Sequence, residues 1–267
     1  MLKWFLLSTL FVGNVFAEVS LTLQGDFVQG GMVIGKSNSP IKTAHVDGVK
    51  VPIHPNKTLF SYGYGRDSKV NSQLIVVFEN GQSKTEFLTI KQREYEVDRV
   101  NGVEQKYVSP PETVLNRIRN DSKMVKAARS KTSLRSDFTQ QVIQPAQGRI
   151  SGVYGSQRVF NGVPKRPHFG LDIAAPTGTQ VIAPWSGQVV LSEPDLYYSG
   201  GTLILDHGMG ITTTYIHLSK LHVEVGQVIE QGQLIAEIGA TGRVTGAHLD
   251  WRLNWFNRRL DPQLLLD

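Results

Sequence analysis

The sequence predicts an all-β protein made of two β domains that a helical linker joins. Short runs of Val, Ile and Leu recur along the 267 residues, and glycine-rich turns separate these runs. One segment, which begins near Ser109, instead has helical spacing and helix-start residues. We therefore expect an N-terminal β domain at residues 18–108, a helical linker at 109–137 and a C-terminal β domain at 138–267.

Residues 1–17 have the composition of a cleavable secretory signal. Lys3 supplies the positive start, residues 4–12 form a short apolar run, and Val15 and Ala17 are small residues suited to a cleavage site. The apolar run is too short to span a bilayer with ease. We expect an exported protein whose mature form has no membrane span.

The composition narrows the chemistry further. The chain has no cysteine, which excludes disulfides, thiolate metal sites and a lipid-modified cysteine at the cleavage point. Its formal charge of +5 favours anionic polymers such as cell-wall glycan. Export, and the lack of a basic run interleaved with aromatic residues, argue against a nucleic-acid partner.

The N-terminal β domain contains two strong hairpin signals. Asp47-Gly48 and Asn80-Gly81 each lie between two runs of strand-forming residues. Such dipeptides favour tight turns between antiparallel strands. They predict a small antiparallel sandwich or barrel.

The linker begins with a helix-start signature. Ser109 can cap the helix, Pro110 suits its first position, and Glu112 completes a capping box. Apolar residues follow at helical spacing to about residues 129–131. We expect a connector helix that packs on one domain and turns its lysines and arginines to solvent.

The C-terminal domain carries two stretches rich in potential metal ligands, residues 167–172 and 246–251. From His248 to Trp255, polar residues alternate with Leu and Trp. Because side chains two apart on a strand share a face, His248 and Asp250 should lie together on the polar face.

Other histidines are less informative by themselves. His168 and Asp172 are four residues apart, and in an extended segment this even spacing lets both side chains point the same way. We expect His217 to share a face with Tyr215, and we interpret His207 as a turn residue.

The C-terminal domain contains a series of motifs in a fixed order. They include Gly152-Val153-Tyr154-Gly155, His168-Phe169-Gly170-Leu171-Asp172, Pro176-Thr177-Gly178-Thr179, Tyr215-Ile216-His217-Leu218-Ser219, Thr241-Gly242-Arg243, Gly246-Ala247-His248 and Asp261-Pro262. In these motifs the domain resembles the M23 family of zinc metallopeptidases, the lysostaphin/LytM-type peptidoglycan endopeptidases. The N-terminal β domain, at residues 29–31 and 60–67, more loosely resembles the extra domain of Gram-negative relatives.

The resemblance implies a LytM-type antiparallel sheet and a role for each site residue. His168 and Asp172 would bind one zinc ion per chain, and His217 and His248 would be the catalytic histidines. Where the family has the second His of a His-x-His pair as the third zinc ligand, this chain has Asp250.

Aspartate can serve as a zinc ligand at a similar bond length. A second carboxylate makes the ligand charge −2, so the bound water should be a weaker acid; Arg252, on the same face, can offset part of that charge. The other interpretation is a decayed site, which the retention of the four remaining site residues disfavours.

The leading hypothesis is a monomeric, zinc-dependent endopeptidase of the periplasm that hydrolyses the peptide cross-links of peptidoglycan. The alternative is a non-catalytic wall-binding module or amidase activator of the same fold. A broad secreted protease is a third hypothesis.

Overall fold

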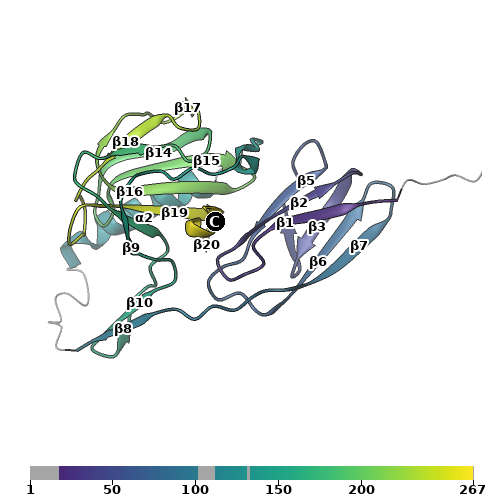
Figure 1. Ribbon diagram of the computed structural model, residues 1–267, viewed down its shortest axis with the longest axis horizontal. Helices are drawn as coiled ribbons and strands as arrows, with labels where there is room; N and C mark the ends of the chain where they lie inside the picture. Colours follow the sequence, from purple (N-terminus) through teal and green to yellow (C-terminus); the bar gives the residue numbers. More distant parts are fainter. Residues whose placement is uncertain (1–17, 102–111, 131–132, 267) are drawn as a thin grey trace, which may run out of the picture.

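The computed structural model describes residues 18–101, 112–130 and 133–266. Two β lobes lie side by side, and the C-terminal strand pair approaches the N-terminal lobe (Figure 1). The proposed signal at residues 1–17 and the helix-start residues Ser109 and Pro110 lie outside the described residues. No helix of the described chain is long and apolar enough to cross a membrane. The predicted all-β fold class is confirmed.

The N-terminal lobe is a sandwich of two antiparallel sheets. Both predicted hairpins are present: residues 47–48 and 80–81 join neighbouring antiparallel strands, and Asp47, Gly48 and Gly81 have positive φ. One sheet has the order β1-β2-β5 and the other the order β4-β3-β6-β7. The strands are β1 (Leu21–Gly25), β2 (Met32–Ser37), β3 (Ile41–Val46), β4 (Val49–Val51), β5 (Leu59–Gly63), β6 (Asn71–Phe78) and β7 (Ser83–Thr89).

A small third sheet ties the two lobes together. Strand β8 (Val97–Val100) pairs in parallel with β10 (Gln157–Phe160), which pairs in turn with β11 (Val163–Pro164). The chain therefore leaves the sandwich before residue 97 and makes its next strand contact with the C-terminal half.

The linker forms a 3-10 turn, η1 (Glu112–Val114), followed by helix α2 (Leu115–Ser130). The helix ends where the sequence predicts and packs on the C-terminal lobe, as expected of a connector. Its Val125 and Ala128 contact a small apolar cluster that includes Leu191 and Ile204. One expectation is wrong: Arg129 is not solvated but 5% exposed, because it lies on the side of the helix that covers the sheet.

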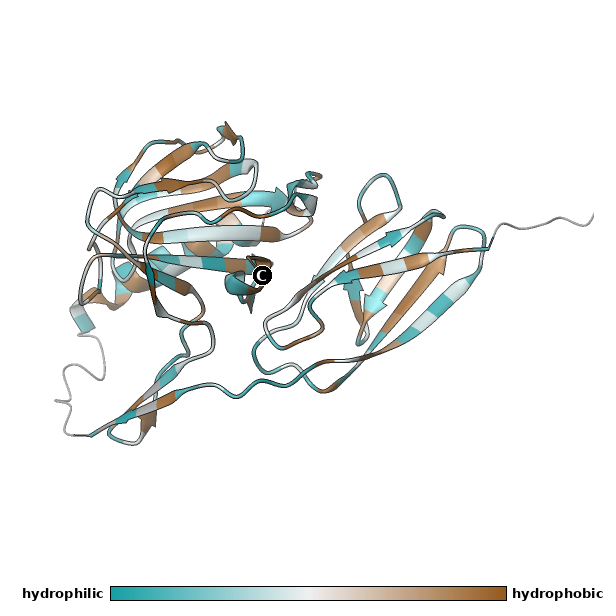
Figure 2. Ribbon diagram, in the orientation of Figure 1, coloured by the Kyte–Doolittle hydropathy of each residue, from teal (hydrophilic) through white to brown (hydrophobic). Residues whose placement is uncertain are grey.

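The C-terminal lobe is built on one large antiparallel sheet. Its main path has the order β17-β14-β15-β16-β19-β12-β9, with β13, β18 and β20 attached beside it. Figure 2 shows hydrophobic and hydrophilic residues alternating along its strands. The elements are η2 (Asp137–Thr139), β9 (Arg149–Gly152), β12 (Leu171–Ala174), β13 (Gln180–Ile182), β14 (Gly187–Leu196), β15 (Gly200–Gly208), β16 (Ile211–Leu221), β17 (Val228–Ile229), β18 (Leu234–Ile238), β19 (His248–Trp255), β20 (Arg258–Leu260) and η3 (Pro262–Leu265).

The two lobes share an interface at β20. The Arg258 guanidinium donates to the Gly63 carbonyl oxygen at 2.7 Å, and the Tyr62 and Trp255 rings lie 4.7 Å apart between centroids. Arg93 forms an ion pair of 2.6 Å with the buried carboxylate of Asp261. Aromatic packing and a paired buried charge therefore hold the lobes together.

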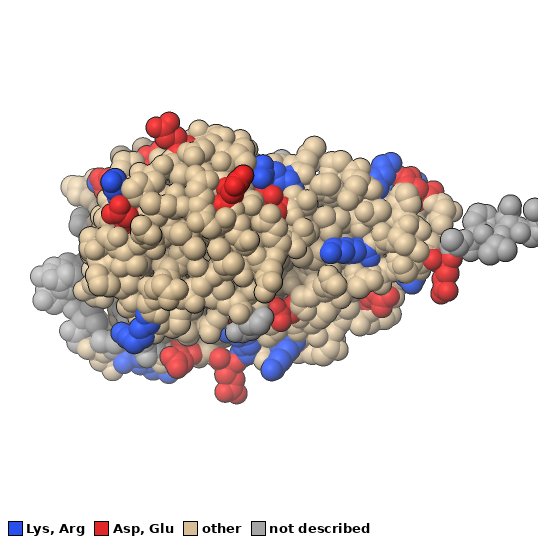
Figure 3. Space-filling view, turned by 45° about the horizontal axis from the view of Figure 1, so that its top comes forward, with Lys and Arg blue, Asp and Glu red and all other residues tan. Residues whose placement is uncertain are grey.

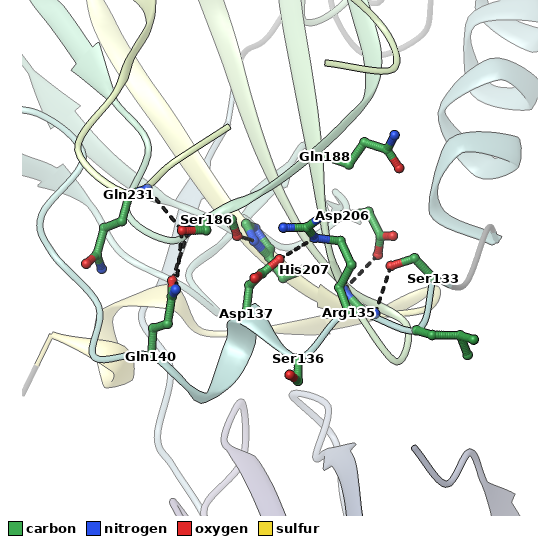
Figure 4. Close-up of polar contacts among 12 residues, drawn as sticks. Ser133, Arg135, Ser136, Asp137, Gln140, Ser186, Gln188, Asp206, His207 and Gln231 are labelled. Carbon is green, nitrogen blue, oxygen red and sulfur yellow. Dashed lines mark hydrogen bonds and ion pairs between the residues drawn. The ribbon is translucent and has the colours of Figure 1, made fainter. Parts of the chain in front are cut away.

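Residues 133–140 lie against the end of β15 (Figure 4). The Ser186 backbone N–H donates to Gln140 Oε1 at 3.0 Å, and the Met209 N–H donates to the Ser133 carbonyl oxygen at 3.1 Å. This segment packs so close to the end of β15 that only a glycine fits at position 208. A Cβ at Gly208 would lie 1.8 Å from the Arg135 carbonyl oxygen.

His207 is not a turn residue, as the sequence suggested, but a fully buried part of β15. Its Nδ1 donates to the Ser186 carbonyl oxygen at 2.7 Å, because a carbonyl oxygen can only accept. Its Nε2 then accepts from the Thr213 hydroxyl at 2.7 Å. Burial lowers the pKa of His207 to about 4. The imidazole is therefore a neutral core group.

Candidate metal centre

The pairing of three strands brings together carboxylates that are far apart in the sequence. On β12, Asp172 lies directly opposite Asp250 of β19. On the other side of β19, Ile216 of β16 lies opposite the same Asp250. Residues directly opposite each other on antiparallel strands share a face, so both carboxylates project from one side of the sheet.

Three donor groups converge on this face. One ligand atom each from His168, Asp172 and Asp250 can be chosen so that all lie within 4.8 Å of one another. His168 Nε2 and Asp172 Oδ1 are 3.2 Å apart, close to the roughly 3.4 Å edge of a tetrahedron with zinc-ligand bonds of about 2.1 Å.

Two of these atoms are buried and face each other. His168 Nε2 and Asp172 Oδ1 lie 3.2 Å apart, but neither has a hydrogen bond of normal geometry among the described residues. Buried polar atoms nearly always have a well-formed hydrogen bond, so a close His–Asp contact without one calls for an explanation. A divalent cation would satisfy both, so the donor set fits a metal ion.

Glycines leave room for the carboxylates. A Cβ at Gly170 would lie 1.9 Å from Asp250 Oδ1, and one at Gly152 would lie 2.3 Å from Asp172 Oδ2. Any side chain at either position would displace a carboxylate of the cluster.

Arg252 pairs with Asp250 on the same face of β19, as the alternation predicted. Its Nε donates to Asp250 Oδ1 at 2.9 Å and its Nη2 to Oδ2 at 2.5 Å. Burial by itself raises the pKa of Asp250, but the charge and hydrogen bonds of Arg252 outweigh it and bring the pKa to about 2. Asp250 is therefore ionised and has one positive partner already.

The two remaining histidines stand beside the cluster. The His217 and His248 rings lie 4.8 Å apart between centroids, and His248 Nε2 is 3.8 Å from Asp172 Oδ1. His217 Nδ1 donates to the Thr241 carbonyl oxygen and His248 Nδ1 to the Gly246 carbonyl oxygen, both at 2.9 Å. When neutral, each ring thus has its proton on Nδ1 and an unprotonated Nε2.

His217 reaches this place by a departure from strand geometry. Tyr215 lies opposite Trp251 on the core face, and the sequence expectation that His217 shares that face is wrong. The φ of His217 is +68°, in the left-handed region, and its pairing with β19 ends at Ile216. The bend turns the imidazole to the polar face, toward His248.

The histidines differ in protonation. Burial lowers the pKa of His168, but the close contact with the Asp172 carboxylate and the charge of Asp250 outweigh it, so its pKa is raised. Burial also lowers the pKa of His217, and there the opposing bond to Thr241 does not compensate. His217 is thus a neutral imidazole at neutral pH, while a cation at the cluster must compete with a proton on His168.

A nitrogen and two carboxylate oxygens with flanking imidazoles form the kind of donor set that metal-dependent hydrolases use. The model of peptidase family M23 matches residues 166–262, and the C-terminal lobe is a domain of that family. The predicted resemblance is thereby confirmed.

The sequence is also similar to two named endopeptidases. The chain is 29% identical over 195 residues to the peptidoglycan DD-endopeptidase ShyB and 42% identical over 107 residues to ShyA, both of Vibrio cholerae. It covers only 41% and 24% of their lengths, and these matches take up 73% and 39% of this chain.

A solved structure of a protein described as a peptidase of family M23, from Pseudomonas aeruginosa, superimposes with a TM-score of 0.70 at 26% identity. The match covers 90% of this chain and 94% of that one. The arrangement of both lobes therefore has a counterpart in a solved structure.

Proposed function

We propose that this chain is an exported, zinc-dependent endopeptidase that hydrolyses peptide cross-links of peptidoglycan in the periplasm. The observation that carries the proposal is the convergence of His168, Asp172 and Asp250, two of which present buried donor atoms that lack a hydrogen bond of normal geometry among the described residues. The M23 domain and the relatives named peptidoglycan DD-endopeptidases support the reaction and the substrate class.

His168, Asp172 and Asp250 would hold the ion, and three protein ligands leave a fourth position for water. Zinc bound there would supply a Lewis acid for the scissile carbonyl and a more acidic water. His217 and His248 each keep Nδ1–H on a backbone carbonyl, which fixes the ring and leaves Nε2 free to accept a proton. In this proposal one imidazole would take the proton of the attacking water on Nε2 and pass it to the leaving amine. The other imidazole, protonated on Nε2 from solvent, would donate to the oxyanion.

Asp250 alters the charge of the ligand set. With two carboxylates the set carries −2, which neutralises Zn²⁺ and makes bound water a weaker acid. The bidentate bond from Arg252 withdraws part of that charge. We therefore expect Arg252 to be needed to keep the carboxylate pair compatible with an acidic water.

The test is digestion of purified sacculi, with mass spectrometry of the released muropeptides. The full chain should release fragments cut at the cross-link and hold about one zinc ion per chain. His168→Ala and Asp172→Ala should abolish both zinc retention and cleavage, while His222→Ala, at an exposed histidine outside the cluster, should change neither. Cleavage that persists in the first two variants would refute the metal role. Folded protein that never retains zinc would instead favour a wall-binding module.

A further inference from the structure

A second feature of the C-terminal lobe lies between helix α2 and the polar face of the sheet. A cavity of about 440 Å³ opens there, and four arginines line it: Arg129 of α2, Arg166, Arg252 of β19 and Arg259 of β20. In contrast, the lysines and arginines on the face in Figure 3 are scattered among acidic residues. Positive charge is thus gathered inside the lobe.

The guanidinium groups of Arg129 and Arg259 bond only neutral side chains among the described residues. Arg129 is 5% exposed; its Nη2 donates to Thr214 Oγ1 at 3.0 Å, and its Nε has no partner among the described residues. Arg259 Nη1 donates to Asn254 Oδ1 at 3.2 Å, and its Nε is likewise buried without a described partner. Neutral acceptors satisfy part of each group, but they do not balance its charge.

The arginines also repel one another. Burial, together with the charges of Arg252 and Arg166, lowers the pKa of Arg129 to about 9. Burial lowers the pKa of Arg259 well below its usual value, with Arg129 as the next cause. A buried charge without a counter-charge is strongly unfavourable, so Arg129 and Arg259 call for an anion.

The carboxylates nearby do not meet that need. Asp250 already receives both bonds of Arg252. Asp121 lines the cavity and its Oδ2 accepts from the Tyr197 backbone N–H at 2.7 Å, but its single charge does not balance those of the four arginines. The cavity therefore holds more positive than negative charge, and its lining includes a further lysine, Lys126.

The cavity adjoins the candidate metal centre. Ile216, which lines the cavity, lies opposite Asp250 in the sheet, and Arg252 contacts the cavity and Asp250 alike. A peptide whose scissile bond lay at the metal centre could therefore extend a nearby group into the cavity. A carboxylate would suit it, because its two oxygens match the paired N–H groups of arginine.

We propose that this cavity is an anion-binding site that takes a free carboxylate of the peptide substrate. Its position as a substrate subsite rests on the proposed endopeptidase function, whereas anion binding itself does not. Arg129 and Arg259 are binding residues in this proposal, and Arg252 links the subsite to the metal centre.

The first experiment measures anion binding without catalysis. The thermal midpoint of the full, metal-free chain is followed during titration with N-acetyl-D-alanine, with its amide, and with sodium chloride at equal ionic strength. The carboxylate should raise the midpoint above both controls, and inorganic phosphate provides a second oxyanion probe. The proposal would be overturned if the carboxylate did not raise the thermal midpoint above the controls, or if phosphate alone raised it.

Variants locate the effect. Arg129→Met and Arg259→Met keep an unbranched apolar stem and remove the guanidinium charge, and each should weaken carboxylate binding at least tenfold. Arg119→Gln is the matched control, because Arg119 is an exposed arginine of α2 outside the cavity lining. Wild-type affinity in either folded methionine variant would overturn the assignment; if one fails to fold, the other decides.

The second experiment separates this inference from the proposed function. Cross-linked muropeptides are prepared with their free carboxylates intact or amidated. Arg129→Met should raise KM about tenfold for the free-carboxylate substrate, with kcat retained, and should leave the amidated substrate unaffected. Failure of wild type to cut either substrate would contradict the endopeptidase function alone, whereas equal KM values for variant and wild type would contradict the subsite alone.

Discussion

Replacement of Gly170 by alanine should release the metal without unfolding the domain. The new Cβ would lie 1.9 Å from Asp250 Oδ1 and 3.0 Å from Arg252 Cγ. The carboxylate oxygen must move by roughly 1.5 Å to reach ordinary contact near 3.4 Å, whereas metal-ligand distances tolerate only about 0.2 Å. We expect zinc affinity to fall by at least about tenfold, and the free energy of unfolding by about 1–3 kcal/mol.

The assay is zinc competition with a chelating dye, alongside chemical denaturation of the metal-free protein. Gly246→Ala is the matched control: Gly246 lies two residues before His248, and a Cβ there meets no atom within 4 Å. Its zinc affinity should match that of wild type. Unchanged zinc affinity in folded Gly170→Ala would show that the Asp250 carboxylate is not a ligand, and would refute the reasoning.

The remaining predictions concern charge and protons. Asp250→His supplies an imidazole ligand but removes the buried partner of Arg252, so denaturation should show a loss of about 3 kcal/mol in the free energy of unfolding. The added change Arg252→Gln should restore part of this loss. A single variant as stable as wild type would contradict the prediction. Because the pKa of His168 is raised, zinc affinity by dye competition should fall as pH falls through that pKa, and a flat profile would argue against His168 as ligand. The pKa of His207 is about 4 in the folded protein and about 6.5 in the unfolded chain. Below about pH 6.5 the unfolded chain therefore binds a proton that the folded protein does not, and the free energy of unfolding should fall by about 2–3 kcal/mol between pH 7 and 4.5. Denaturation of His207→Gln should lack this component, and an equally steep loss in that variant would assign it elsewhere.

Local sequence patterns determined much of the fold. Asp47-Gly48 and Asn80-Gly81 each form the predicted hairpin turn, because these residues accept the backbone angles that such turns require. The alternation from His248 to Trp255 placed Asp250 and Arg252 on one face, because strand geometry is periodic in two residues. The end of α2 at Ser130 also followed from local signals.

The site required more than local pattern. The even spacing of His168 and Asp172 allowed them to meet, but the register that sets Asp172 opposite Asp250 depends on pairing between distant strands. The rule that residues two apart on a strand share a face put His217 on the wrong face. The rule assumes regular strand angles, whereas His217 has a φ of +68°. The resemblance to a known family, and not the spacing, supplied the role of His217.

Sequence alone therefore determined the strand and turn pattern, the polar face of β19 and the identity of the candidate ligands. Only the tertiary structure decided that Arg129 is buried, that His207 is a neutral core imidazole, and that four arginines surround one cavity. The physical reason is the distance along the chain over which each interaction acts. Turn preference and side-chain alternation act between neighbours in the chain, whereas desolvation and charge repulsion depend on which distant segments the fold packs together.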